Sequence, residues 1–321
     1  MNNNNFNQAV KEAKNIIVIS HVNPDGDTLS AVLALTLLIK THYNKDVTPV
    51  YTNKIPEIYD FLPQIDLYKN VKDIDPEVKY DLAIAVDVAS KERMGEAGQL
   101  FEKAKKTINI DHHKTNKGFA DIDIIDPAAC SAGQVIFDIA ESLNLSISKE
   151  IAVCFYTSIL TDTGCFKYEN TSVKTFITAS KLVELGANPC EISRACYDSK
   201  PQNMVQFQVS VINNAKFDFG GKVAYAIITK DIMDKFNASD DYTDGISEAL
   251  RQIKTVEASI VLKEVENQFT KVSMRSKTID VSKIAGIFNG GGHTYAAGCT
   301  IKKPPKVAIN KLLEYISREI V

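Results

Sequence analysis

Short apolar runs that each end at a histidine or an aspartate are the feature that most constrains the fold of this chain. The runs are IIVIS before His21, YDLAIAV before Asp87 and TINI before Asp111. Segments with helical spacing of apolar residues, such as 27–40, lie between them. Continuously apolar strands that alternate with helices are typical of a parallel sheet covered on both faces. The sequence therefore predicts an α/β domain with polar side chains gathered at the carboxyl edge of its sheet.

A second domain is expected after residue 188. The chain has 321 residues, and domains usually have roughly 100–200 residues, so about two domains are expected. The strand and helix pattern loosens at 186–203, where Pro189 and Pro201 interrupt it. We expect a catalytic domain at 1–188, a linker and connecting helix at 189–215, and a smaller α/β domain at 216–321.

The charge of the chain argues against a protein that follows long nucleic acid. The formal net charge is −3, whereas such proteins usually carry a basic surface. Small anionic ligands are compatible with this charge, because bound metal ions can supply positive charge locally. The start, MNNNNFNQAVKEAKN, has no apolar signal core, and no apolar run is long enough to cross a bilayer. We therefore expect a cytoplasmic protein with no membrane partner.

The loop after the first run, HVNPDGD at 21–27, combines an imidazole with two carboxylates. Pro24 and Gly26 shape the loop, so that Asp25 and Asp27 can point to two different places. A segment that reaches two ions suits a site with two metals. The alternative is an ordinary turn with Asp27 as a helix cap.

Three further positions offer ligands after apolar segments. Asp87 is either a capping group or a ligand, and one carboxylate shared by two cations commonly holds them about 3.5–4 Å apart. His112 and His113 point in opposite directions in an extended segment, so one can bind an ion while the other faces a substrate. Asp162 by itself is typical of a turn or a cap. Oxygen and nitrogen ligands without thiolates favour Mn²⁺ or Mg²⁺ over a structural Zn²⁺ site.

A run of glycines, Gly290-Gly291-Gly292, precedes His293 near the end of the chain. Such a run brings backbone N–H groups close to a ligand and suits anion binding, although a flexible turn is the alternative. It is not a P-loop, because the Lys-Ser/Thr pair is missing, and it is not a G-x-G-x-x-G fingerprint.

In combination, HVNPDGD, AVD, DHH, TDTG and GGGHTYAAG give the chain a specific likeness from about residue 16 to residue 298. It resembles the DHH phosphoesterase superfamily, and within it the branch of bifunctional oligoribonucleases (nanoRNases) and pAp phosphatases. The last motif is similar to the DHH-associated C-terminal domain. The resemblance implies a parallel-sheet DHH domain and a smaller C-terminal α/β domain, with the active site in the cleft between them. It also suggests a homodimer.

The resemblance also implies two Mn²⁺ ions, with Mg²⁺ or Co²⁺ as alternatives, and a role for each motif residue. The ligands of one ion are His21, Asp25 and Asp87; those of the other are Asp27, Asp87, His112 and Asp162. Asp87 bridges the ions, and His113 lies next to the scissile phosphate. Asp111 supports the site from behind the residues that contact ions or substrate. The implied substrate-binding residues are Arg275, Gly291, Gly292 and His293, with Ser131 and Arg93 as further candidates for phosphate contact.

The function that the resemblance implies is hydrolysis of very short RNA to mononucleotides, as an exonuclease, and of pAp to AMP. Linear dinucleotides such as pApA belong to the same substrate class. A cyclic di-AMP phosphodiesterase would use the same site. A non-catalytic nucleotide sensor would have lost ligands, and all of them are present in this chain. An inorganic pyrophosphatase of the same superfamily shares the N-terminal motifs but has a different C-terminal domain, and the GGGH segment argues against it.

Overall fold

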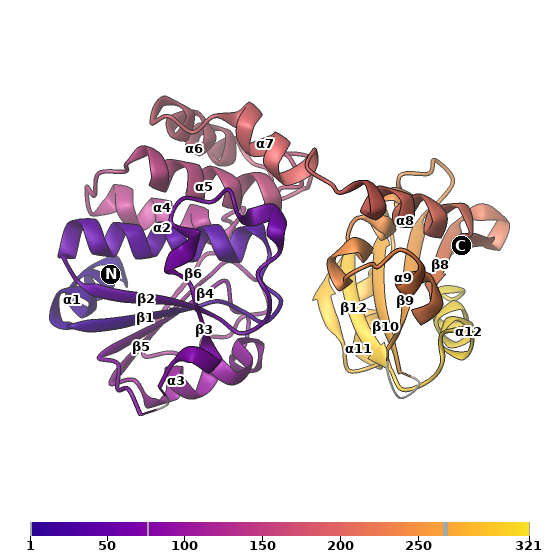
Figure 1. Cartoon of the computed structure of the whole chain (residues 1–321), viewed down its shortest axis with the longest axis horizontal. Helices are drawn as coiled ribbons and strands as arrows, with labels where there is room; N and C mark the ends of the chain where they lie inside the picture. The colour runs from indigo at the N-terminus through magenta and orange to yellow at the C-terminus, as the bar shows by residue number, and fades with distance from the viewer. Residues whose placement is uncertain (1, 76, 266–268, 321) are drawn as a thin grey trace. The chain divides into compact units, whose positions relative to one another are not determined.

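The computed structural model describes residues 2–75, 77–265 and 269–320. The chain divides into two compact units, and the division falls between Ser199 and Lys200. Each unit has a six-stranded sheet with helices on its faces, which confirms the predicted α/β class (Figure 1).

The first unit contains the predicted parallel sheet. Its strand order is β3-β2-β1-β4-β5-β6, and every pair of neighbours is parallel. The strands are β1 Asn15–Ile19, β2 Asp46–Tyr51, β3 Lys69–Asn70, β4 Leu82–Val86, β5 Lys106–Asp111 and β6 Ile122–Ile125. The order reverses between β1 and β4, and this is the point where open α/β sheets bind ligands.

Both faces of this sheet are covered, because successive side chains of a strand point to opposite sides. In β1, Ile16 and Val18 join the core on one face, while Ile17 and Ile19 join the core on the other. The helices on the first face are α1 Asn2–Glu12, α2 Gly26–Tyr43, α4 Ala132–Ser142 and α5 Lys149–Asp162. The second face is covered by α3 Gly98–Lys103 and the 3-10 segment η4 Lys91–Ala97 (Figure 1).

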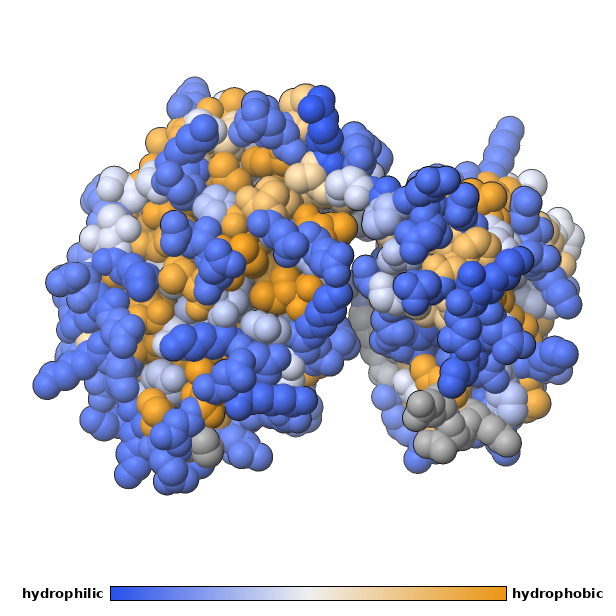
Figure 2. Space-filling model, viewed as in Figure 1, coloured by the Kyte–Doolittle hydropathy of each residue, from blue (hydrophilic) through white to orange (hydrophobic). Residues whose placement is uncertain are grey.

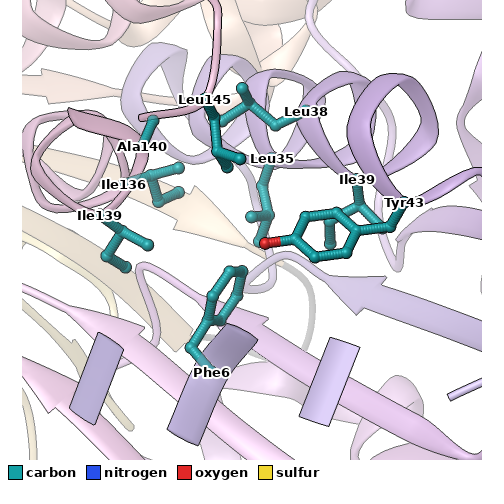
Figure 3. Close-up of a pocket in the computed structure, with 9 residues that line it drawn as sticks. All are labelled: Phe6, Leu35, Leu38, Ile39, Tyr43, Ile136, Ile139, Ala140 and Leu145. Atoms are coloured by element: carbon teal, nitrogen blue, oxygen red, sulfur yellow. The ribbon is translucent and has the colours of Figure 1, made fainter. Parts of the chain in front are cut away.

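Helix α1 was not expected from the Asn-rich start. Phe6, Ala9 and Val10 are buried at helical spacing, so three apolar residues are sufficient to fix the helix against the core. Phe6 borders a small apolar cavity between α1, α2 and α4, which Leu35 and Ile139 also line (Figure 3). With a volume of about 10 Å³ the cavity is at the lower limit for one water molecule and has an almost wholly apolar lining. It is a packing defect without chemical groups.

The second unit has a mixed sheet in the order β11-β12-β10-β9-β8-β7, in which only the β8–β9 pair is parallel. The strands are β7 Lys216–Asp218, β8 Val223–Ile228, β9 Ala258–Val265, β10 Phe269–Ser276, β11 Gly291–His293 and β12 Ala296–Ile301. Helices α11 Val281–Ile287 and α12 Pro305–Ile316 cover one face. Helices α8 Gln202–Asn213, α9 Lys230–Lys235 and α10 Ile246–Arg251 cover the other.

Residues 189–215, which the sequence groups as a linker and connecting helix, are divided between the units. Helix α7 Pro189–Tyr197 packs in the first unit, where Ile192 joins the core beside α5, as does α6 Val173–Glu184. Helix α8 belongs to the second unit through Phe207. The visible face of each unit is mainly hydrophilic, with hydrophobic residues scattered among polar ones (Figure 2). None of the helices in the described ranges is long and apolar enough to cross a bilayer.

Candidate active site

The carboxyl ends of β1, β4 and β5 bring together the residues that follow them. His21 Nε2 lies 3.5 Å from Asp87 Oδ2, and His112 Nε2 lies 3.6 Å from Asp87 Oδ1. All three residues are buried. The reversal of strand order places Asp87 between the two histidines.

The HVNPDGD loop leads directly into α2. Asp25 is the cap of this helix, because its Oδ1 accepts a hydrogen bond of 3.1 Å from the Thr28 N–H. The alternative interpretation of Asp27 as the cap is therefore wrong: Asp27 lies in the first turn and is buried. Gly26 has a packing role, since a Cβ at this position would lie 2.6 Å from Cγ2 of Thr161 in α5.

Two groups of three side chains share this edge of the sheet. In each group the potential ligand atoms lie within 4.8 Å of one another. The groups are His21, Asp25 and Asp87, and Asp27, His112 and Asp162. A third such set joins His113 to Asp87 and His112. His112 Nε2 is 3.7 Å from Asp27 Oδ2 and 3.6 Å from Asp162 Oδ2, while His21 Nε2 is 3.9 Å from Asp25 Oδ2.

The two buried histidines present the nitrogen that binds metals. Nδ1 of His21 lies 2.8 Å from the Val22 carbonyl, and Nδ1 of His112 lies 3.3 Å from the Ala129 carbonyl. A carbonyl only accepts, so Nδ1 carries a proton, and in the neutral form of the ring, which is the form that binds metals, the lone pair is on Nε2. A lone pair that faces carboxylate oxygens at 3.5–3.9 Å is repulsive unless a cation lies between them.

Asp87 shows the same need for a cation. Its Oδ2 accepts a hydrogen bond from Thr28 Oγ1 (2.5 Å), whereas its buried Oδ1 has no hydrogen-bond partner within the described part of the chain. A buried carboxylate oxygen without a partner is destabilising. Oδ1 lies 3.6 Å from His112 Nε2 and 3.5 Å from His113 Nδ1, so a cation there would satisfy it. The residues present therefore fit a metal site.

The electrostatics of the site agree with this conclusion. Burial and the negative charges of Asp87 and Asp162 hold the pKa of Asp27 well above its usual range. Burial and the charge of Asp87 do the same to the pKa of Asp162. Burial also acts to raise the pKa of Asp87, but the hydrogen bond and the charge of His21 outweigh it and lower this pKa. At Asp27 and Asp162, burial and the repulsion between carboxylates outweigh the histidines, which favours cation binding.

Neutral polar groups orient these carboxylates. Asp27 accepts hydrogen bonds from the N–H groups of Ala132 (2.8 Å) and Gly133 (3.3 Å) at the start of α4, and from Ser158 Oγ (2.5 Å). Asn170 Nδ2 donates to Asp162 Oδ2 at 3.2 Å. These partners were not among the residues predicted from the sequence. Ser158 had a signal, as a polar residue inside the apolar helix pattern of α5, whereas Asn170 had none.

His113 and Asp111 form a separate pair beside Asp87. His113 Nδ1 lies 2.8 Å from Asp111 Oδ1, and Asn116 Nδ2 donates to Asp111 Oδ2 at 2.6 Å. Burial lowers the pKa of His113, but the hydrogen bond to Asp111 and the charge of Asp87 outweigh burial and raise it to about 9. Asp111 is fully buried, while 24% of the His113 side chain is exposed, so His113 is accessible from outside.

Ser131 and Arg93 lie near this group in different ways. Ser131 is fully buried and caps α4; its Oγ accepts from the Gln134 N–H at 3.1 Å and lies 2.9 Å from Ser158 Oγ. These contacts favour support of Asp27 through Ser158 over a direct phosphate contact. Arg93 is exposed in η4, and its carbonyl accepts from the Val22 N–H at 2.7 Å, next to the HVNPDGD loop.

The other expected substrate residues lie in the second unit. Arg275 is in β10, where its Nε donates to Glu248 Oε1 at 2.5 Å and its Nη1 donates to the Met274 carbonyl at 3.0 Å. The expected loop Gly291–His293 is instead the short edge strand β11, paired with β12, and all three of its residues are exposed. Glycine has a low strand propensity, so pairing with β12 overrides the local preference.

This arrangement of fold and site defines a class of protein. At the switch point of a parallel sheet lie two neighbouring groups of aspartate and histidine, and Asp87 of the first is 3.6 Å from His112 of the second. This arrangement is typical of a metal-dependent phosphoesterase. Residues 15–159 match the N-terminal domain of the DHH family, and residues 220–321 match the DHHA1 domain. The chain belongs to the DHH family of phosphoesterases and is a hydrolase.

Curated relatives match over most of the chain. The chain is 32% identical over 289 residues to a probable bifunctional oligoribonuclease and PAP phosphatase NrnA of Streptococcus mutans, with 90% of each chain covered. Bifunctional oligoribonuclease and PAP phosphatase NrnA proteins of Thermus thermophilus and Bacillus subtilis are 29% and 28% identical. Those matches cover 95% and 89% of this chain, and 90% and 89% of the relatives.

A solved structure has the same fold. The exopolyphosphatase-related protein of Bacteroides fragilis has a TM-score of 0.90 and 25% sequence identity, with 98% of this chain and 94% of that chain covered. Both domains are therefore common to the two proteins.

Proposed function

We propose that the chain is a manganese-dependent phosphoesterase that degrades very short RNA to mononucleotides, as an exonuclease, and converts pAp to AMP. One observation carries the proposal: Asp87 lies between two neighbouring groups of aspartate and histidine, and Nε2 of His21 and Nε2 of His112 each face one of its carboxylate oxygens. The substrates are those in the names of the relatives from Streptococcus mutans and Thermus thermophilus.

Two cations are proposed, one for each group, with Asp87 as the shared ligand. The first would be held by His21, Asp25 and Asp87, and the second by Asp27, Asp87, His112 and Asp162. Oxygen and imidazole ligands suit Mn²⁺, with Mg²⁺ or Co²⁺ as alternatives. Bound in pairs, such ions make a water nucleophilic and neutralise the charge that develops on the phosphoryl group.

His113 is the residue proposed to contact the scissile phosphate. Its ring is held at Nδ1 by Asp111, and the side chain is partly exposed beside the shared Asp87. A positively charged imidazole in this position would bind a phosphate oxygen and stabilise the departing alkoxide. Asp111 acts through His113 and does not itself contact a substrate.

The second unit is proposed to bind the part of the substrate distant from the reaction. Arg275 suits a terminal phosphate, because its side chain is 29% exposed and its guanidinium is oriented by Glu248. The exposed backbone of Gly291–His293 at the sheet edge suits a phosphate or a base. Arg93, next to the HVNPDGD loop, is a further candidate for phosphate contact. We therefore assign catalysis to 1–188 and substrate capture to 216–321.

A cytoplasmic location is proposed because the cysteines in the described ranges form no disulfide bonds. All six, of which Cys190 is exposed, are free thiols. Unpaired cysteines are typical of a reducing compartment.

Product analysis tests the proposal. The Mn²⁺-loaded protein is incubated with pApA, a five-nucleotide RNA, pAp, cyclic di-AMP and pyrophosphate, each with and without EDTA, and the Asp87→Ala variant is the control. We expect the RNA, pApA and pAp to yield mononucleotides only without EDTA. Consumption of cyclic di-AMP alone would replace the proposed substrates with a cyclic dinucleotide. Binding of nucleotides without cleavage would indicate a sensor.

A further inference from the structure

Thr28 contacts two of the three side chains in the His21, Asp25 and Asp87 group. It lies in the first turn of α2 and is fully buried. Its backbone N–H donates to Asp25 Oδ1 at 3.1 Å, and its Oγ1 donates to Asp87 Oδ2 at 2.5 Å. Thr28 thus links Asp25 of the HVNPDGD loop to Asp87, which follows β4. Asp87 is 59 positions after Thr28 in the sequence.

These two hydrogen bonds fix which oxygen of each carboxylate faces which histidine. Oδ1 of Asp25 accepts from Thr28, and Oδ2 of Asp25 lies on the side of His21 Nε2, at 3.9 Å. Oδ2 of Asp87 accepts from Thr28 and lies 3.5 Å from His21 Nε2. Oδ1 of Asp87 has no hydrogen-bond partner in the described structure and lies 3.6 Å from His112 Nε2. The Asp25 side chain is 61% exposed, so orientation by Thr28 limits a group that would otherwise rotate.

The hydroxyl suits this role better than a cationic donor would. A neutral donor orients a carboxylate and leaves its negative charge available to a metal, which is how partners behind metal ligands act. The carboxylate of Asp27 has more support, because two backbone N–H groups and Ser158 all donate to it. Loss of one side-chain hydroxyl should therefore affect Asp87 more than Asp27.

We infer that Thr28 is a positioning residue for metal binding, whose hydroxyl holds the Asp87 carboxylate with Oδ2 towards His21 and Oδ1 towards His112. The inference rests on the proposed metal-dependent function. It assigns to Thr28 no contact with substrate and no step of the reaction.

The test measures Mn²⁺ binding to the metal-free protein by calorimetric titration, and then kcat and KM for pAp. Thr28→Val removes the hydroxyl but keeps the shape of the side chain and the backbone N–H that donates to Asp25. Thr28→Ser keeps the hydroxyl. Thr36→Val is the matched control, because Thr36 is a buried threonine of the same helix whose Oγ1 has no hydrogen-bond partner in the described ranges.

For Thr28→Val we expect Mn²⁺ affinity to fall about 10–100-fold, the range found when partners of metal ligands are removed. At saturating Mn²⁺, kcat should fall while KM for pAp stays within about threefold, because substrate contacts are intact. Thr28→Ser should restore both quantities, and Thr36→Val should match the wild type. Thermal unfolding of each metal-free variant shows that the fold is intact, and Thr28→Ala replaces the Val variant if that variant does not fold.

The outcomes separate this inference from the proposed function. If the wild type binds Mn²⁺ and Thr28→Val binds it equally well, or if Thr28→Ser is as weak as Thr28→Val, Thr28 is not a positioning residue. If the wild type binds no Mn²⁺, the proposed function fails first.

Discussion

Asp111 Oδ1 and His113 Nδ1 form a part-buried hydrogen bond of 2.8 Å, directly beside the carboxylate of Asp87. Asp111 is fully buried and Asn116 holds its other oxygen, so the bond has one defined geometry. Asp111 thus orients His113 through a carboxylate. In the described part of the chain, Nδ1 of His21 and Nδ1 of His112 contact backbone carbonyls instead.

The first prediction concerns this pair. Asp111→Asn removes the charge that holds His113 and should lower kcat for pAp about 10–100-fold, with little change in KM, as is typical for partners behind active groups. Steady-state kinetics at saturating Mn²⁺ measure the effect. Asp121→Asn is the control, because Asp121 accepts from Thr107 at the opposite end of β5. Equal kcat for the two variants would contradict the proposed role of Asp111.

Removal of the shared carboxylate should remove both activity and metal-dependent stability. At a Mn²⁺ concentration 100-fold above the dissociation constant, a bound ion should stabilise the wild type by about 2.7 kcal/mol. Asp87→Ala should abolish this increment without destabilising the metal-free protein to the same extent, because Oδ1 of Asp87 is buried without a partner in the described chain. Urea unfolding with Mn²⁺ and with EDTA measures both values. More than a few per cent of residual activity would refute the bridging assignment.

Gly133 should be intolerant of a side chain. A Cβ there would lie 2.1 Å from Ser158 Oγ, which donates to Asp27, so Gly133→Ala must displace Ser158. We expect a loss of about 1–3 kcal/mol in the free energy of unfolding, as for other overpacked sites, together with weaker Mn²⁺ binding.

The matched control for this substitution is Gly286→Ala in α11, where a Cβ meets nothing within 4 Å. Alanine is the better helix former, so this variant should gain up to about 1 kcal/mol. Urea unfolding of both variants measures the change in the free energy of unfolding. Similar changes for Gly133→Ala and Gly286→Ala would contradict the packing argument.

Arg275→Ala tests the proposed role of the second unit. If its guanidinium binds a terminal phosphate, KM for pAp and for short RNA should rise about 10-fold or more, since bonds to charged groups contribute about 1.5–3 kcal/mol. The proposed metal site lies in the first unit, so Mn²⁺ affinity should be unchanged. Unchanged Michaelis constants for every substrate would remove Arg275 from the proposed binding residues.

Stability should fall in acid through Asp81. The hydrogen bond from Lys105 Nζ (2.7 Å) and that from the Lys14 N–H (2.9 Å) lower the pKa of Asp81 from 3.8 to about 2. A pKa that is lower in the folded state gives stability that is complete above pH 3.8 and is lost as the pH falls towards 2. Asp81→Asn should therefore destabilise the protein at pH 6 more than at pH 2.5. An equal effect at both pH values, measured by urea unfolding, would show that the charge of Asp81 does not contribute.

Much of the fold of the first unit could be predicted because its signals are local. Apolar runs such as Leu82–Val86 define strands, and the polar residue after each run reaches the same edge in a parallel sheet. Shorter elements were missed for the same reason: β3 has two residues, and β11 consists of Gly291–His293, so neither has enough local preference to be recognised. Pairing with a neighbouring strand is what makes them strands.

The sequence by itself determined the class of fold and the types of candidate metal ligand, because apolar periodicity and motif residues are local features of the sequence. Only the tertiary structure decided how those ligands are held. It made Asp25 the cap of α2 in place of Asp27, and it joined Thr28 to Asp87 and Ser158 to Asp27 across 59 and 131 positions. Contacts of that kind depend on packing between distant elements, and no local pattern contains them.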